Sequence, residues 1–116
     1  VYKRQLVEIL DNLAGQHLNN PRIPVMVKGY FEDMNLVLQE LAQVCRPGAR
    51  VALVVANARF HGELIPVDLL LSDLAVDAGF EVERIIITRY KGNSSQQMGR
   101  FGRVAVRESI AVWRKV

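Results

Sequence analysis

The sequence contains one cysteine, Cys45, and no apolar run near the roughly 18 residues that a membrane-spanning helix needs. A lone thiol cannot close a disulfide within the chain. The chain also shows no positively charged start followed by an apolar stretch and a small-residue cleavage site, the pattern of a secretory signal. With half of its 116 residues apolar, the chain is long enough for one core. We expect one soluble domain, or part of one, in the cytoplasm.

Acidic residues are scarce in the last quarter of the chain. Residues 1–88 contain eight cations and eleven acids, whereas residues 89–116 contain seven cations and only Glu108 as an acid. This asymmetry favours a polyanionic partner, although a solvated pair of strands accounts for it about as well.

Groupings of residues with catalytic or metal-binding character are also missing. His17 and His61 have no partner at a metal-ligand spacing, and Cys45 lies on an apolar helix stripe, so we predict no metal site. Glu108 and Ser109 are adjacent on an expected strand and point to opposite faces, so they cannot act on one substrate atom. We expect Glu108 to pair with a nearby arginine.

Apolar periodicity predicts three helices. Stripes recur over residues 6–14, 34–45 and 66–78, with Gly15, the Pro47–Gly48 pair and Gly79 at their ends. Residues 19–24 contain two prolines and are expected to form a loop. Residues 1–5 resemble non-native sequence and receive no structural role, which leaves residues 6–116 as the domain.

Three apolar runs predict strands. The run "VALVVA" (51–56) has no polar alternate, which is typical of a central parallel strand covered on both faces. Residues 82–88 and 104–113 are rich in β-branched side chains and too close in sequence for a crossover helix, so they should pair antiparallel. The expected order is helix, helix, strand, helix, strand, loop, strand.

This order and two sequence stretches resemble the C-terminal half of class I S-adenosylmethionine-dependent methyltransferases. Residues 30–57 are similar to a helix that runs through a Lys/Arg-Pro-Gly turn, here Arg46-Pro47-Gly48, into the fifth strand of those enzymes. The resemblance implies an α/β fold: the C-terminal part of a Rossmann-like methyltransferase sheet, with a parallel central strand, an antiparallel final hairpin and flanking helices.

Within that superfamily the chain most resembles bacterial site-specific DNA methyltransferases that modify an exocyclic base amine, N6 of adenine or N4 of cytosine. Residues 92–110, "GNSSQQMGRFGRVAVRESI", carry this narrower resemblance. Two alternatives remain: a fragment of an RNA guanine methyltransferase, and a non-enzymatic nucleic-acid-binding α/β module that is complete as it stands.

Two motifs that the resemblance leads one to expect are missing. The chain has neither a glycine-rich turn for S-adenosylmethionine nor an Asp/Asn/Ser-Pro-Pro-aromatic tetrapeptide; Asn20-Pro21-Arg22 lacks the second proline and the ring. Gly99 and Gly102 lie between strands and do not open a helix. The resemblance therefore implies a partial domain, 6–116, without catalytic or cofactor-binding residues, which is inactive alone and whose parent uses S-adenosylmethionine.

The polar, cationic loop between the last two strands is the candidate nucleic-acid surface, with DNA favoured over RNA as the partner. Cations there suit phosphates, as does Arg107, and Phe101 is placed to stack on a base, whereas Trp113 is expected in the core. Asn57 and Arg59 follow the carboxyl end of strand 51–56, where open α/β sheets bind ligands, although Asn57 suits a local backbone contact equally well. The predicted contact residues are Asn57, Arg59, Arg89, Lys91, Asn93, Ser94, Ser95, Gln96, Gln97, Arg100, Phe101 and Arg103.

Overall fold

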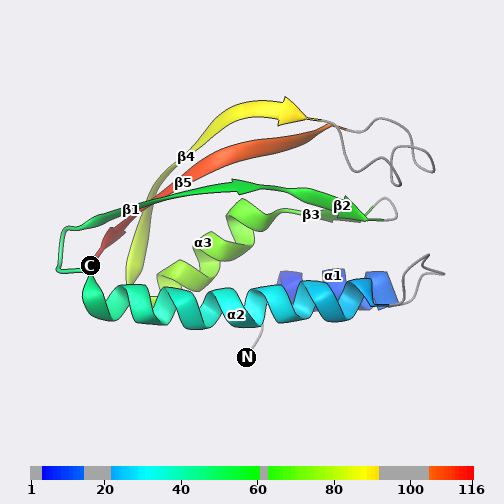
Figure 1. The fold of residues 1–116 in the computed structure, drawn as a ribbon, viewed down its shortest axis with the longest axis horizontal. Coiled ribbons are helices and arrows are strands. Elements are labelled where there is room, and N and C mark those ends of the chain that lie inside the picture. Colours follow the sequence, from blue (N-terminus) through cyan, green and yellow to red (C-terminus); the bar gives the residue numbers. More distant parts are fainter. Residues whose placement is uncertain (1–3, 15–21, 61–62, 92–104) are drawn as a thin grey trace.

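A computed structural model describes residues 4–14, 22–60, 63–91 and 105–116, and in it a three-stranded sheet lies above three helices (Figure 1). All three helices lie on the same side of the sheet. A small two-stranded hairpin extends from one end of the sheet. The elements are α1 (Arg4–Ala14), α2 (Ile23–Val44), β1 (Arg50–Ala56), β2 (Ala58–Phe60), β3 (Glu63–Ile65), α3 (Val67–Ala78), β4 (Phe80–Lys91) and β5 (Val106–Lys115).

The first helix is confirmed, with an earlier start than predicted. α1 buries Leu6, Ile9 and Leu13, which recur at helical spacing. It begins at Arg4, whose Nε lies 3.2 Å from Glu8 Oε1 one turn later, so two of the five residues given no structural role are helical.

The second helix, of 22 residues, is nearly twice as long as its predicted stripe. α2 begins at Ile23, one residue before Pro24. A proline in the first turn does not interrupt a helix, because the N–H that it lacks would have no helical partner there. The prediction of a loop through Pro24 was therefore wrong at its end. Ile23, Val27 and Phe31 extend the buried face of Leu38 toward the N-terminus.

The boundaries of α3 follow the sequence signals. Pro66 is the residue before the helix, and Gly79 ends it in the left-handed conformation, with φ of 117°. A side chain at Gly79 would be strained at this φ, which is why the apolar stripe stops there.

The sheet has the order β1-β5-β4, and both pairings are antiparallel. The predicted hairpin of the last two strands is confirmed. The predicted parallel central strand is not: β1 pairs only with β5 among the described strands, at the edge of the sheet. β1 and β4 run in the same direction, but β5 separates them.

Coverage of β1 also differs from the prediction. Val51, Leu53 and Val55 face the helices, whereas Val54 on the opposite face is 69% exposed. Val54 is therefore an apolar residue on the face of the sheet that points away from the helices, where no described residue covers it.

The short hairpin of β2 and β3 was missed. Ala58 pairs with Ile65, and Phe60 pairs with Glu63. Three-residue strands carry too little alternation to be recognised, and this segment was read as a loop leading into α3.

Trp113 anchors the interface between the sheet and the helices, as expected for a core residue. Its side chain is fully buried against Phe80, and its indole N–H donates to Ser72 Oγ over 3.0 Å. Ser72 in turn donates to the carbonyl of Asp68 within α3. None of the described helices is both long enough and apolar enough to cross a membrane.

We predict that Ser72→Ala lowers the free energy of unfolding by about 1–3 kcal/mol, because the buried Trp113 indole loses its acceptor. Thr88→Ala is the matched control, since it also removes one hydroxyl hydrogen bond, but at an exposed site. Urea unfolding measures both. Equal losses in the two variants would contradict the role assigned to Ser72.

Candidate nucleic-acid interface

The carboxyl end of β1 is fastened to the start of α3 by Asn57. Its backbone N–H donates to the Arg107 carbonyl over 3.0 Å, and its side-chain Oδ1 accepts from the Asp68 N–H over 3.2 Å. Pro66 has no side chain able to cap the helix, so Asn57 supplies the cap from eleven residues away. Asn57 is only 6% exposed, and this backbone contact is one of the two roles considered for it.

Asp68 is fully buried at the centre of this junction. One carboxylate oxygen accepts from Arg107 Nε and Ser109 Oγ, both over 2.8 Å, and the other accepts from the Leu69 N–H over 2.8 Å. Burial by itself raises the pKa of Asp68, but these hydrogen bonds and the charge of Arg107 outweigh it and hold the pKa below its ordinary value of 3.8. The carboxylate is thus ionised and fixes the Arg107 guanidinium.

A shallow cleft of about 250 Å³ opens beside the junction. Arg59 and Arg107 supply two guanidinium groups, Tyr90 supplies an aromatic ring, and Leu64 and Leu69 supply apolar walls. Tyr90 on β4 pairs directly with Arg107 on β5. Two guanidiniums beside an aromatic ring suit an anionic group attached to a planar one.

Two further cations lie on β4, and both contact one carboxylate, that of Glu108, on the face of the sheet opposite Arg107 and Ser109. Arg89 Nε lies 2.6 Å from Glu108 Oε2, and Lys91 Nζ lies 3.4 Å from Glu108 Oε1. The hydrogen bond from Arg89 is the main cause that lowers the pKa of Glu108. The expected pairing of Glu108 with an arginine is confirmed, and the cluster keeps a net positive charge.

The structure places Asn57 and Arg59 at the cleft, and it places Arg89 and Lys91 around Glu108 on the other face of the sheet. It adds two residues that were not predicted, Tyr90 in the cleft and Asp68 beside it. Sequence reasoning assigned no role to Tyr90 or Asp68, and placed Arg107 only among the phosphate-binding cations. One signal for Asp68 was available in the sequence. It is an acid in the first turn of a helix, two residues after Pro66, which has no side chain able to cap that helix. Asn93, Ser94, Ser95, Gln96, Gln97, Arg100, Phe101 and Arg103 lie outside the described residues.

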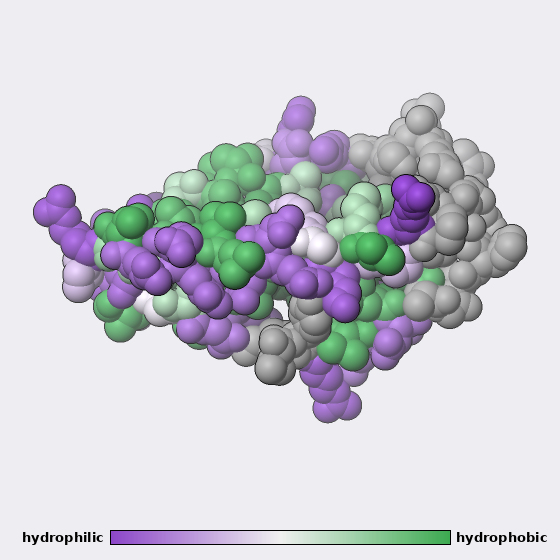
Figure 2. All heavy atoms as spheres, turned by 60° about the horizontal axis from the view of Figure 1, so that its bottom comes forward, coloured by the Kyte–Doolittle hydropathy of each residue, from purple (hydrophilic) through white to green (hydrophobic). Residues whose placement is uncertain are grey.

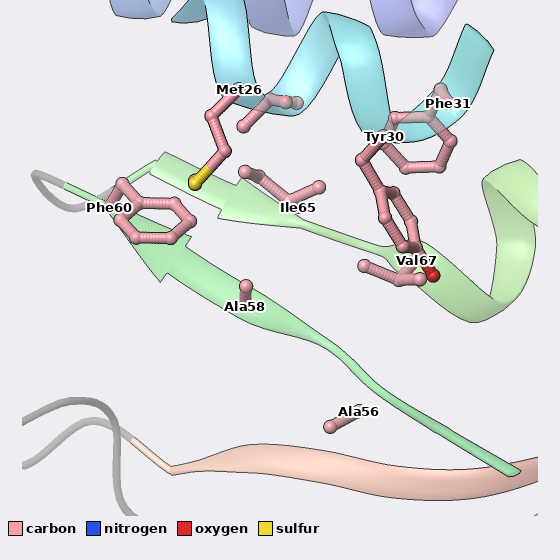
Figure 3. Close-up of a pocket in the computed structure, with 9 residues that line it drawn as sticks. Met26, Tyr30, Phe31, Ala56, Ala58, Phe60, Ile65 and Val67 are labelled. Atoms are coloured by element: carbon pink, nitrogen blue, oxygen red, sulfur yellow. The ribbon is translucent and has the colours of Figure 1, made fainter. Parts of the chain in front are cut away.

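A second pocket, of about 290 Å³, is apolar and lies between α2 and the strands (Figure 3). Met26 and Tyr30 extend from α2 toward the strands, with Ala56, Ala58 and Phe60 across from them. Burial raises the pKa of the Tyr30 hydroxyl. This lining offers apolar contact and no described group suited to acid–base chemistry.

Comparison with known proteins identifies the family. The chain is 50% identical over 99 residues to the type II methyltransferase M.BsoBI of Geobacillus stearothermophilus, a match that covers 84% of the chain. It is 46% identical over 104 residues, 89% of the chain, to the type II methyltransferase M.AvaI of Nostoc sp. and of Anabaena variabilis. The chain is homologous to a segment of type II methyltransferases.

These matches cover 19% of the Geobacillus methyltransferase and 22% of the other two, so the chain spans about a fifth of the length of its curated relatives. No family model and no solved structure matches the chain. The predicted resemblance to the methyltransferases is confirmed.

We predict that Asp68→Asn destabilises the protein at pH 7, by less than the roughly 3–5 kcal/mol typical of a broken, fully buried pair, since Arg107 is 26% exposed. Because the folded pKa of Asp68 is lowered, its contribution is complete above the unfolded pKa and is lost as the pH falls through the folded pKa. The gap between wild type and variant should therefore begin to narrow below about pH 4 and narrow further as the pH falls toward the folded pKa.

The measurement is urea unfolding from pH 7 to pH 3. Glu81→Gln is the control, because Glu81 holds Arg114 at an exposed site and should contribute less than about 1 kcal/mol. A gap for Asp68→Asn that stays constant with pH would contradict the ionised, paired state of Asp68.

Proposed function

We propose that this chain is part of an S-adenosylmethionine-dependent DNA methyltransferase that modifies an exocyclic base amine, N6 of adenine or N4 of cytosine. The observation that carries the proposal is the 46–50% identity to type II methyltransferases over 84–89% of the chain. In such a reaction the cofactor supplies an electrophilic methyl group, and the protein positions the amine of a flipped base for displacement.

The described residues do not fit the cofactor itself. The sulfonium of S-adenosylmethionine is cationic, and the cleft beside Asn57 presents the guanidiniums of Arg59 and Arg107. Asp68 is buried and already accepts from three donors, so it is not available for ribose hydroxyls. We therefore assign the cofactor site and the catalytic groups to other parts of the parent enzyme.

The contribution of this segment is the end of the sheet and a surface for DNA. Arg59 and Arg107 border the cleft, with Asp68 fixing the guanidinium of Arg107, and Arg89 and Lys91 form a separate cationic cluster around Glu108 on the other face of β4 and β5. A fixed guanidinium loses little freedom when it binds a phosphate. The predicted contacts from residues 93–103 would continue this surface along the chain.

We predict that the purified 116-residue chain transfers no methyl group to duplex DNA, whereas the same segment grafted in place of its match in the Geobacillus relative supports transfer. Labelled S-adenosylmethionine measures incorporation, and nucleoside analysis of the product distinguishes N6-methyladenine from N4-methylcytosine. The unaltered relative is the positive control. Transfer by the chain alone, or an inactive but folded graft, would contradict the proposal.

We also predict that the chain binds duplex DNA and that Glu108→Gln tightens binding by about threefold at low salt, because Arg89 and Lys91 lose their shared carboxylate. Fluorescence anisotropy across a salt series measures affinity. Glu81→Gln, whose partner Arg114 lies at the opposite end of β5, is the matched control and should bind like wild type. Equal effects of the two substitutions would show that the cluster around Glu108 does not face DNA.

A further inference from the structure

Charge is divided between the two layers of the molecule. The three helices contain eight acids and two cations, whereas the described strands contain eight cations and four acids. In Figure 2, which brings the helix side forward, hydrophobic atoms interrupt the hydrophilic surface in patches. A polyanion is therefore repelled by the helix layer and attracted to the strands.

Within the sheet, the excess of positive charge lies at one end. At the far end the cations are matched by acids: Arg50 Nε lies 2.9 Å from Glu83 Oε1, and Arg114 pairs with Glu81. At the other end, residues 89–91 of β4 and 106–108 of β5 contain three cations and one acid, Glu108. A polyanion is attracted most strongly to this second end.

The cationic end is a ribbon of two strands. The pairing of β1 with β5 stops where Ala56 lies opposite Glu108. Beyond that point residues 90–91 still pair with residues 106–107. Figure 1 shows β4 and β5 running side by side to this end. The sheet thus narrows from three strands to two where its charge is most positive.

Both faces of this ribbon carry cations. Arg89 and Lys91 lie with Glu108 on the face away from the helices, and Arg107 lies on the cleft face. Arg89 donates to both oxygens of Glu108, over 2.6 and 3.2 Å, with the fork geometry in which a guanidinium also holds a phosphate. On the cleft face Asp68 fixes the guanidinium of Arg107. Each face can therefore hold a phosphate independently of the other.

We infer that this ribbon enters the major groove of duplex DNA end-on, with the Arg89–Lys91 face turned to the backbone of one strand and the cleft face to that of the other. A sheet with side chains on both faces is about 10 Å thick, which fits a major groove about 12 Å wide but not a minor groove about 6 Å wide. On the cleft side Arg59 and Arg107 both reach the backbone.

This inference rests on the proposed function in DNA modification and adds to it which element enters the duplex. The substitutions are Arg89→Gln on the outer face and Arg59→Gln on the cleft side. Arg107→Gln is unsuitable, because it would leave the buried carboxylate of Asp68 without its guanidinium. Arg114→Gln is the matched control, since it removes the same charge at the opposite end of β5. Thermal unfolding checks that each variant is folded.

The first experiment measures fluorescence anisotropy of labelled DNA with the 116-residue chain across a salt series. With duplex DNA, Arg89→Gln and Arg59→Gln should each reduce the slope of log K against log salt by about one, and together by about two. A single strand of about six nucleotides has one backbone, so with it the double substitution should reduce the slope by about one at most. Arg114→Gln should bind both like wild type.

Two outcomes of this experiment would overturn the inference. An unchanged duplex slope for either Arg89→Gln or Arg59→Gln would show that one face alone contacts DNA, which would leave the proposed function in place. Losses that add on the single strand as they do on the duplex would show that both faces bind the same backbone.

The second experiment locates the two faces on DNA in the graft within the Geobacillus relative. Lys91→Cys and Tyr90→Cys place a thiol on opposite faces of the ribbon, in a graft otherwise freed of cysteine, and each thiol carries an iron chelate that cleaves nearby DNA. The cuts from the two positions should fall on opposite strands. Cuts on the same strand, or on neither, would overturn the inference. Opposed cuts by a graft that transfers no methyl group would count against the proposed function alone.

Discussion

The buried carboxylate of Asp68 joins the helix α3 to the sheet, and the arrangement of the surrounding elements depends on it. A charge removed from water is tolerated only when donors surround it, and here those donors come from β5 and from α3 itself. Through Asn57 the same junction reaches the end of β1. One side chain thereby fixes the helix layer against the sheet and fixes the orientation of Arg107 in the cleft.

The two edge strands of the sheet differ in regularity and composition. β4 has register shifts and charged residues, which suit an edge exposed to water, whereas β1 has no register shift and is apolar after Arg50. The cleft with its arginines lies near the end of β1, where the strand leaves the sheet toward β2.

Helix positions could be read from the sequence because each helix buries a stripe whose period is set by its own geometry. Val67–Ala78 between Pro66 and Gly79 is the clearest case. The start of α2 was missed because Pro24 signals a break in most contexts and is acceptable only in a first turn. The site was harder to predict, since Asp68, Tyr90 and Arg107 come from three elements and meet only after folding.

The family resemblance, the helices, the strand runs and the antiparallel hairpin could all be read from the sequence, because they depend on local patterns and short separations. The position of β1 at an edge and the capping of α3 by Asn57 depend on contacts between distant residues, so they became visible only in the folded chain. The same holds for the contacts of Glu108 with both Arg89 and Lys91. An apolar run such as "VALVVA" reads the same whether its neighbour lies in this chain or elsewhere, since hydrophobicity records that a face is to be buried but not which segment covers it.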